Sequence, residues 1–297
     1  MFDCLIAGEA NVDLLVNGVL ELEVGKEKLA DDLSLVLGGS SAITAFNLSQ
    51  LGASVRFAAV LGRDAFGYFV SQKMEEAGID ISAIRWLDQE KTGVTIWHSL
   101  ARERAGVTYA GTIARLRASD VTHEVLTSAR HLHVGAYFLL TALHPDAPEL
   151  FLTAKRAGLT TSLDCNYDPS ETWDSNIWQV LRHTDVFFPN EQEARLLTHC
   201  DDPLSAARRL NQFAQLVVVK LGAEGALVVT REETFHQPAV AVADVVDTTG
   251  AGDSFNAGFL SQYVRGASLR ACAEAGTQAA SRSVTKIGGT AAFEQAQ

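Results

Sequence analysis

Short apolar runs, often β-branched, alternate with longer amphipathic segments along most of the chain. This periodicity predicts buried strands over residues 2–8, 55–60, 131–134, 160–164, 186–189 and 216–221. The segments between them predict helices over residues 41–51, 66–77, 145–157, 191–198 and 204–213. Regular alternation of strand and helix is typical of a parallel sheet that helices cover on both faces.

The pattern changes after residue 221. Gly222-Ala-Glu-Gly225 predicts a turn, and residues 226–230 and 234–237 predict two antiparallel strands added to the sheet. Two further helices are expected over residues 252–264 and 269–284.

Two segments have strand-like alternation but no helix to cover them, residues 13–37 and 92–112. Together they predict a small β-sheet outside the main domain, serving as a lid or as a dimer surface. We therefore assign residues 13–37 and 93–112 to the lid. Residues 1–12, 38–92 and 113–297 are assigned to one α/β domain that binds nucleotide and substrate.

Composition is that of a globular protein with a large core, because 47% of its 297 residues are hydrophobic and 20% are charged. A net charge of −12 argues against binding of duplex DNA, which favours a basic face. The four cysteines contain no C-x-x-C pair, which predicts reduced thiols. With neither a signal peptide nor an apolar run of roughly 20 residues, we expect a cytoplasmic protein that binds no membrane.

The string Asp247-Thr-Thr-Gly-Ala-Gly-Asp253-Ser-Phe-Asn-Ala-Gly-Phe-Leu260 carries the strongest chemical signal. Small residues before a helix let backbone N–H groups and the helix dipole hold an anion. A carboxylate at Asp253 repels that anion, which makes sense if it takes a proton from a hydroxyl attacking a phosphoryl group. The alternative is an ordinary helix start. A dinucleotide fingerprint fails at Phe255, and no P-loop sequence occurs.

The string closely resembles the second signature of the ribokinase-like, or PfkB, carbohydrate kinases, and the resemblance extends from Gly8 to Gly289. It implies a three-layer α/β/α fold with a central, mostly parallel sheet and a small β-sheet lid. It also implies an ATP-dependent kinase that uses Mg²⁺. In such a kinase Asp253 is the general base, and the amides around Gly250, Ala251 and Gly252 form the anion hole.

On the substrate side, Gly38-Gly39 stands at a strand-to-helix junction, where the family has its first signature. Asn11 and Asp13 follow the first strand, and ligands of open parallel sheets gather beyond strand carboxyl ends. Asn166 belongs to a D-x-N motif that the resemblance also assigns to the sugar. Tight-turn glycines and Asx turns in a solvated loop are the structural alternatives.

On the nucleotide side, Asn190 and Glu193 have the spacing of a capping box. The resemblance adds that this N-x-x-E motif orders Mg²⁺, largely through water, and the phosphates. It further implies nucleotide contacts and, from two residues, a possible monovalent cation site for K⁺. The nucleotide residues are Asn190, Lys220, Gly222, Gly225, Gly252, Thr277 and Gly288, and the cation residues are Asp247 and Thr249.

Three departures from the family pattern affect the choice of substrate. Ile43 replaces an asparagine, Gly135-Ala-Tyr137 stands where ribokinases have a glutamate, and Asp168 replaces an arginine. Without that arginine an acidic sugar lacks its bidentate partner, and Asp168 in its place would repel the substrate carboxylate. We therefore expect a neutral, fructose- or ribose-like sugar phosphorylated at its primary hydroxyl.

Two other functions remain open, and so does the oligomeric state. A nucleoside kinase of the same fold would stack a base on aromatic side chains, for which Trp97, Tyr109 and Tyr137 are candidates. A sugar sensor without turnover is disfavoured, because it has no use for Asp253. The uncovered strands also suggest a homodimer formed through the lid. The expected partners are a small sugar and ATP, with no nucleic acid.

Overall fold

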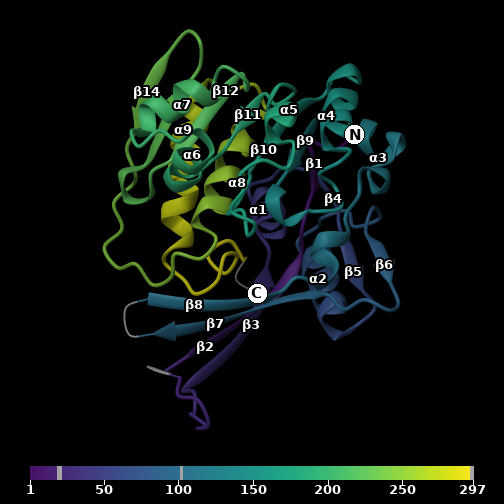
Figure 1. Cartoon of the computed structure of the whole chain (residues 1–297), viewed down its shortest axis with the longest axis vertical. Coiled ribbons are helices and arrows are strands. Elements are labelled where there is room, and N and C mark those ends of the chain that lie inside the picture. The colour runs from purple at the N-terminus through teal and green to yellow at the C-terminus, as the bar shows by residue number, and fades with distance from the viewer. Residues whose placement is uncertain (19–21, 101–102, 295–297) are drawn as a thin grey trace.

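The computed structural model describes residues 1–18, 22–100 and 103–294. An eight-stranded sheet runs through the main domain (Figure 1). Its strands lie in the order β14 (Thr234–Gln237), β13 (Ala226–Val229), β12 (Leu216–Lys220), β11 (Val186–Phe187), β10 (Thr160–Leu163), β9 (His131–Val134), β1 (Cys4–Ala7) and β4 (Val55–Ala58). The strands from β12 to β4 are parallel, whereas β13 and β14 are antiparallel, as predicted.

Helices cover both faces of this sheet, which confirms the predicted three-layer fold. One layer contains α1 (Ser40–Gln50), α2 (Ala65–Glu76), α8 (Ala251–Tyr263) and α9 (Leu269–Ser283). The other contains α3 (His123–Thr127), α4 (Ala147–Arg156), α5 (Ile177–Leu181), α6 (Glu191–Thr198) and α7 (Pro203–Leu210). In β1, Cys4 and Ile6 pack on the first layer while Leu5 and Ala7 pack on the second. Burial on both faces explains why the strands are continuous apolar runs.

The structure differs from the sequence prediction in its short elements. The strand expected over 55–60 ends at Ala58, and β5 (Val60–Gly62) pairs instead with β6 (Arg85–Leu87). The short helices α3 and α5 were not predicted, because one turn is too short to show a helical period. Within the part of the chain that the structure describes, the connections also contain the 3₁₀ turns η1 (Gly111–Arg115), η2 (Ala118–Asp120), η3 (Tyr137–Leu139) and η4 (Gly222–Glu224).

The uncovered strands form a separate four-stranded sheet, hereafter the small sheet, which projects beyond the helices (Figure 1). Its order is β3 (Asp32–Gly38), β2 (Asn11–Asn17), β7 (Gly93–Leu100) and β8 (Glu103–Tyr109). Residues 19–21 and 101–102 of the predicted lid lie outside the described residues. Because side chains alternate between faces, Asp13 and Thr95 share one face, and Leu14 and Ile96 share the other.

All four cysteines are free thiols, as predicted. Among the described residues, every helix is too short or too polar to cross a membrane.

Candidate active site

Asp253 lies in the first turn of α8, directly after the predicted small-residue turn. Gly250 precedes the helix with a φ of 73°, and a Cβ there would lie 2.6 Å from the Cα atom of Gly289. Both the left-handed backbone and the close approach require glycine. The first N–H groups of α8 lie at the positive end of the helix dipole, where that of Ala251 donates to the Thr248 carbonyl at 3.2 Å.

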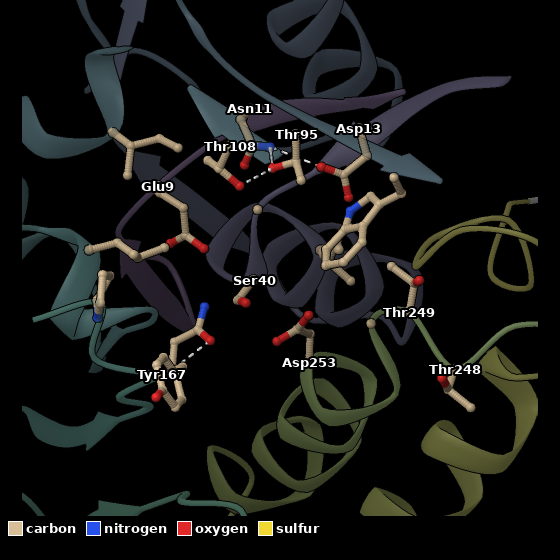
Figure 2. Close-up of a pocket in the computed structure, with 18 residues that line it drawn as sticks. Glu9, Asn11, Asp13, Ser40, Thr95, Thr108, Tyr167, Thr248, Thr249 and Asp253 are labelled. Carbon is tan, nitrogen blue, oxygen red and sulfur yellow. Dashed lines mark hydrogen bonds between the residues drawn. The ribbon is translucent and has the colours of Figure 1, made fainter. Parts of the chain in front are cut away.

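The carboxyl group of Asp253 has a pKa well above that of a free aspartate. Burial and the carboxylate of Asp164 raise the pKa of Asp253 to about 7, whereas the Lys220 ammonium and the Ser40 hydroxyl act to lower it. Figure 2 shows the Ser40 hydroxyl facing the Asp253 carboxyl group. A carboxyl group with a pKa near the working pH is suited to accept a proton during a reaction.

Two cavities, of about 620 and 530 Å³, meet at the start of α8. Gly250 and Asp253 line the first, whereas Ala251 and Gly252 line the second. Thr248 lines both. One helix start thus presents a carboxyl group to one cavity and its N-terminal residues to the other.

Most of the expected substrate residues line the first cavity: Asn11, Asp13, Gly39 and Asn166. Asn11 donates from Nδ2 to Oδ1 of Asp13 at 3.0 Å, and burial raises the pKa of Asp13 to about 6. Gly38 does not line the cavity. It lies against Asp13, since a Cβ at this position would be 2.3 Å from Oδ1 of Asp13. Gly38 therefore makes room for a cavity residue and is not itself one.

Other residues of this cavity were not assigned from the sequence: Glu9, Ser40, Thr95, Thr108 and Tyr167. Strand alternation could have indicated Thr95, because it pairs with Asp13 and so faces the same way. It also indicates Trp97, two residues further along β7, which lines the cavity as one of the proposed stacking residues. Glu9 carried no comparable signal.

The second cavity contains most of the residues that the resemblance assigned to the nucleotide: Lys220, Gly222, Gly225, Gly252 and Thr277. The rest of its lining is largely aliphatic, with valines from the 240–245 loop and Phe255 of α8. A largely apolar cavity with glycines and a lysine near the helix start has the character of a site for a base and its phosphates.

Asn190 and Glu193 line neither cavity. They form the predicted capping box, in which Oδ1 of Asn190 accepts the Glu193 N–H and Oε2 of Glu193 accepts the Asn190 N–H, each at 2.8 Å. Burial and nearby Asp164 raise the pKa of Glu193 to about 7, while Lys220 acts to lower it. Ligand atoms of Glu193, Asp164 and Cys165 lie within 4.8 Å of one another. A thiol does not suit Mg²⁺, so these three residues do not form a set of direct Mg²⁺ ligands.

Asp247 connects the loop before α8 with the C-terminal loop. Its Oδ1 accepts the Thr249 N–H at 2.6 Å, and its Oδ2 accepts the Gly288 N–H at 2.8 Å. Gly288 is therefore linked through Asp247 to the loop before α8 and does not line the second cavity. Thr249 lines the first cavity.

Three side chains do not lie where the sequence interpretation placed them. Tyr137 is fully buried and donates its hydroxyl to the Ser175 carbonyl at 2.6 Å, so it cannot stack a base. Tyr109 is 53% exposed and does not line the first cavity, whereas its neighbour Thr108 does. Asp168 is buried and accepts the N–H groups of Ser170 and Trp173. Asp168 thus orders its own loop and cannot repel a substrate directly.

The chain matches one family of known proteins over nearly its full length. The model of the pfkB family of carbohydrate kinases matches residues 1–296. The chain belongs to this family. It is therefore an ATP-dependent sugar kinase.

Individual relatives differ in the substrates that their names give. The ATP-dependent 6-phosphofructokinase of Thermoanaerobacterium thermosaccharolyticum is 26% identical, over 93% of this chain and 85% of the relative. The 2-dehydro-3-deoxygluconokinase of Bacillus subtilis is 31% identical, over 81% and 78%. The structure of adenosine kinase from Sinorhizobium meliloti superposes with a TM-score of 0.86 at 25% identity, covering 97% of this chain and 95% of that one. Family membership therefore does not determine the acceptor.

Proposed function

We propose that this kinase transfers the γ-phosphoryl group of ATP to the primary hydroxyl of a neutral sugar, with Asp253 as general base. The observation that supports this most is the meeting of the two cavities at the start of α8. The sugar occupies the cavity lined by Asp253, and ATP occupies the cavity lined by Lys220 and Gly252.

In this mechanism the sugar oxygen attacks the γ-phosphorus while its proton passes to the carboxylate of Asp253. The bond between the γ-phosphorus and the bridging oxygen breaks, and ADP leaves with that oxygen. The N–H groups around Gly250, Ala251 and Gly252 stabilise the charge on the transferring group. Closing the small sheet over the cavity would exclude water from the reaction.

Mg²⁺ bound to ATP would neutralise part of the phosphate charge. Glu193 lines neither cavity, so it would act on the ion through water. A monovalent cation near Asp247 and Thr249, such as K⁺, remains a proposal that rests on the resemblance.

The charge of the first cavity supports a neutral substrate. Three carboxyl groups line it, those of Glu9, Asp13 and Asp253, and no lysine or arginine does so among the described residues. A substrate carboxylate would find no cationic partner in this cavity and would lie near the carboxylate of Asp13, whose pKa of about 6 leaves it mostly ionised at neutral pH. Hydroxyl groups can bond to carboxyl and amide side chains of this kind. The reason to disfavour acidic sugars is therefore the whole lining and not Asp168.

A nucleoside acceptor is the second candidate. Trp97 lines the cavity and offers an indole surface for a base, and one similar structure is described as an adenosine kinase. The deciding experiment measures kcat/KM for fructose, ribose, 2-keto-3-deoxygluconate and adenosine by ADP release. We expect fructose or ribose to be preferred, and a clear preference for either of the other two would refute the proposal.

We also propose that the kinase is a homodimer formed through the small sheet. Its outer face carries apolar side chains that the main domain does not cover, including Leu33, Leu35 and Val107, which are 62%, 39% and 69% exposed. These residues alternate with inner-face residues, so they form one surface. A second copy of this face would bury them symmetrically.

A further inference from the structure

Glu9 is a buried carboxyl group in the substrate cavity that has no role in the mechanism above. It follows β1 directly, two residues before Asn11, and its side chain is almost fully buried. It nevertheless lines the same cavity as Asp253 (Figure 2). Burying a carboxyl group is costly unless its oxygens find partners, so this position calls for an explanation.

Ser41 holds the carboxyl group of Glu9 in place. The Ser41 hydroxyl donates to Oε2 at 2.5 Å, and the Ser41 N–H donates to Oε1 at 3.4 Å. Two glycines make room for this contact. A Cβ at Gly8 or at Gly135 would lie 1.9 or 2.6 Å from the Ser41 hydroxyl oxygen. The support therefore depends on residues from three separate segments of the chain.

Ser41 does not exhaust the hydrogen-bonding capacity of Glu9. A carboxyl group offers about four acceptor positions when ionised, and one donor when protonated. Each oxygen receives one hydrogen bond from Ser41, so each can still bond to a group in the cavity. No basic side chain lines that cavity among the described residues. Burial raises the pKa of Glu9 to about 8, which suits a neutral acid facing a neutral ligand.

We propose that Glu9 is a specificity-determining residue that hydrogen-bonds a non-reacting hydroxyl of the substrate. This inference rests on the proposed function, because the reacting hydroxyl must lie at Asp253. In Figure 2 the carboxyl groups of Glu9 and Asp253 lie on opposite sides of Ser40. A hydroxyl bound by Glu9 is therefore a second one. The acceptor site accordingly selects polyols that present a free hydroxyl at that position.

A purely structural role makes a different prediction. The N-cap of α1 is Gly39, which has no side chain to cap the helix, and no acidic residue lies in the first turn. Glu9 accepts the Ser41 N–H and so substitutes for a cap. If capping were its whole function, replacing Glu9 would lower stability but would leave the ranking of substrates unchanged.

The test combines Glu9→Ala with deoxy analogues of the best neutral sugar. In the wild type, removing the hydroxyl that faces Glu9 should lower kcat/KM. In Glu9→Ala we expect kcat/KM for the parent sugar to fall by about 10- to 100-fold, mainly through KM, while KM for ATP is unchanged. In Glu9→Ala, the parent sugar and the analogue that lacks this one hydroxyl should then have the same kcat/KM. Glu9→Gln keeps a donor and an acceptor, and should retain activity within about fivefold.

The inference is overturned if Glu9→Ala leaves kcat/KM within about twofold, or if it lowers activity equally for the parent and every deoxy analogue. Should Glu9→Ala not fold, Glu9→Asp replaces it, because aspartate keeps the acid but withdraws it by one methylene. Calorimetry without ATP measures the affinity of the same compounds directly, so the role of Glu9 is tested even if no phosphoryl group is transferred. If only nucleosides are accepted, the neutral-sugar proposal fails, and deoxynucleosides decide the role of Glu9 by the same comparison.

Discussion

Lys220 forms a buried ion pair with Asp164, in which Nζ lies 2.6 Å from Oδ2, although the two residues are 56 positions apart. Lys220 ends β12, Asp164 follows β10, and β11 lies between these strands. Asn256 of α8 donates to the same oxygen. Burial acts to lower the pKa of Lys220, but the carboxylates of Asp164 and Glu193 raise it overall. A charged ammonium is thus fixed beneath the start of α8.

Lys220 should matter for the use of ATP. A Cβ at Gly252 would lie 3.4 Å from Nζ of Lys220, so the ammonium is close to the proposed phosphate site. We expect Lys220→Met to lower kcat/KM for ATP by about 10- to 100-fold, because a charged hydrogen-bond donor is lost. Lys155→Met is the matched control, since Lys155 pairs with Asp185 at 2.6 Å but lines neither cavity. Equal effects of the two substitutions would show that Lys220 acts only on stability.

Replacing the proposed base should abolish most of the turnover. We expect Asp253→Asn to lower kcat by about 10²–10⁴-fold, because asparagine has the size of aspartate but cannot accept the proton. ATP affinity, measured by calorimetry, should be largely retained. Turnover of the wild-type magnitude in this variant would exclude Asp253 as the base.

The same variant should change the dependence of stability on pH. The folded-state pKa of Asp253 is raised to about 7 from 3.8, so ionisation favours the unfolded state. The Asp253 carboxyl group therefore contributes fully to the free energy of unfolding of the wild type below pH 4. This contribution is lost as pH rises through 7. We expect the melting temperature of Asp253→Asn relative to wild type to be higher at pH 8 than at pH 4. A constant difference over this range would contradict the assigned shift.

The pH profile of kcat/KM should fall on its acidic side because Asp253 becomes protonated there. Only the ionised carboxylate can accept the proton, and its fraction grows as pH rises through the pKa of about 7. We expect kcat/KM at low sugar concentration to increase from pH 5.5, with its midpoint near 7. A rate that is flat between pH 5.5 and 8 would mean that another step or another group limits turnover.

Substrate should close the small sheet over the first cavity. Asn11, Asp13 and Thr95 project from this sheet into the cavity, so a bound sugar would connect it to the main domain. We expect hydrogen exchange in residues 11–17 and 93–100 to slow when sugar and a non-hydrolysable ATP analogue are added together. Unchanged exchange would count against closure, and slow exchange in the free protein would favour a surface already buried in a dimer.

The outer face of the small sheet should determine the oligomeric state. We expect the double substitution Leu33→Glu and Val107→Glu to convert a dimer to a monomer in sedimentation experiments, because it places charges in an apolar contact. Val24→Glu is the control, since Val24 is fully exposed but lies outside the four strands. A wild-type monomer at high protein concentration would refute the proposed dimer.

The sequence by itself determined the local structures. The turn at Gly250, the start of α8 and the capping box of α6 all follow from residues within a few positions of one another. Hydrophobic periodicity predicted the parallel sheet for a similar reason. The pattern of apolar residues within each strand shows whether one or both of its faces are buried. The family signature gave the proposed general base, Asp253, from a short contiguous string.

Only the tertiary structure decided which side chains meet. Asp168 and Tyr137 are residue types that suit a binding site, but packing turns both of them away from the cavity. Glu9 carried no sequence signal, yet Ser41 directs it into that cavity. Such contacts depend on the order of strands in the sheet and on the direction of each side chain. Residues that are close in sequence do not determine which side chains make contact, because the contacting residues come from segments that only folding brings together.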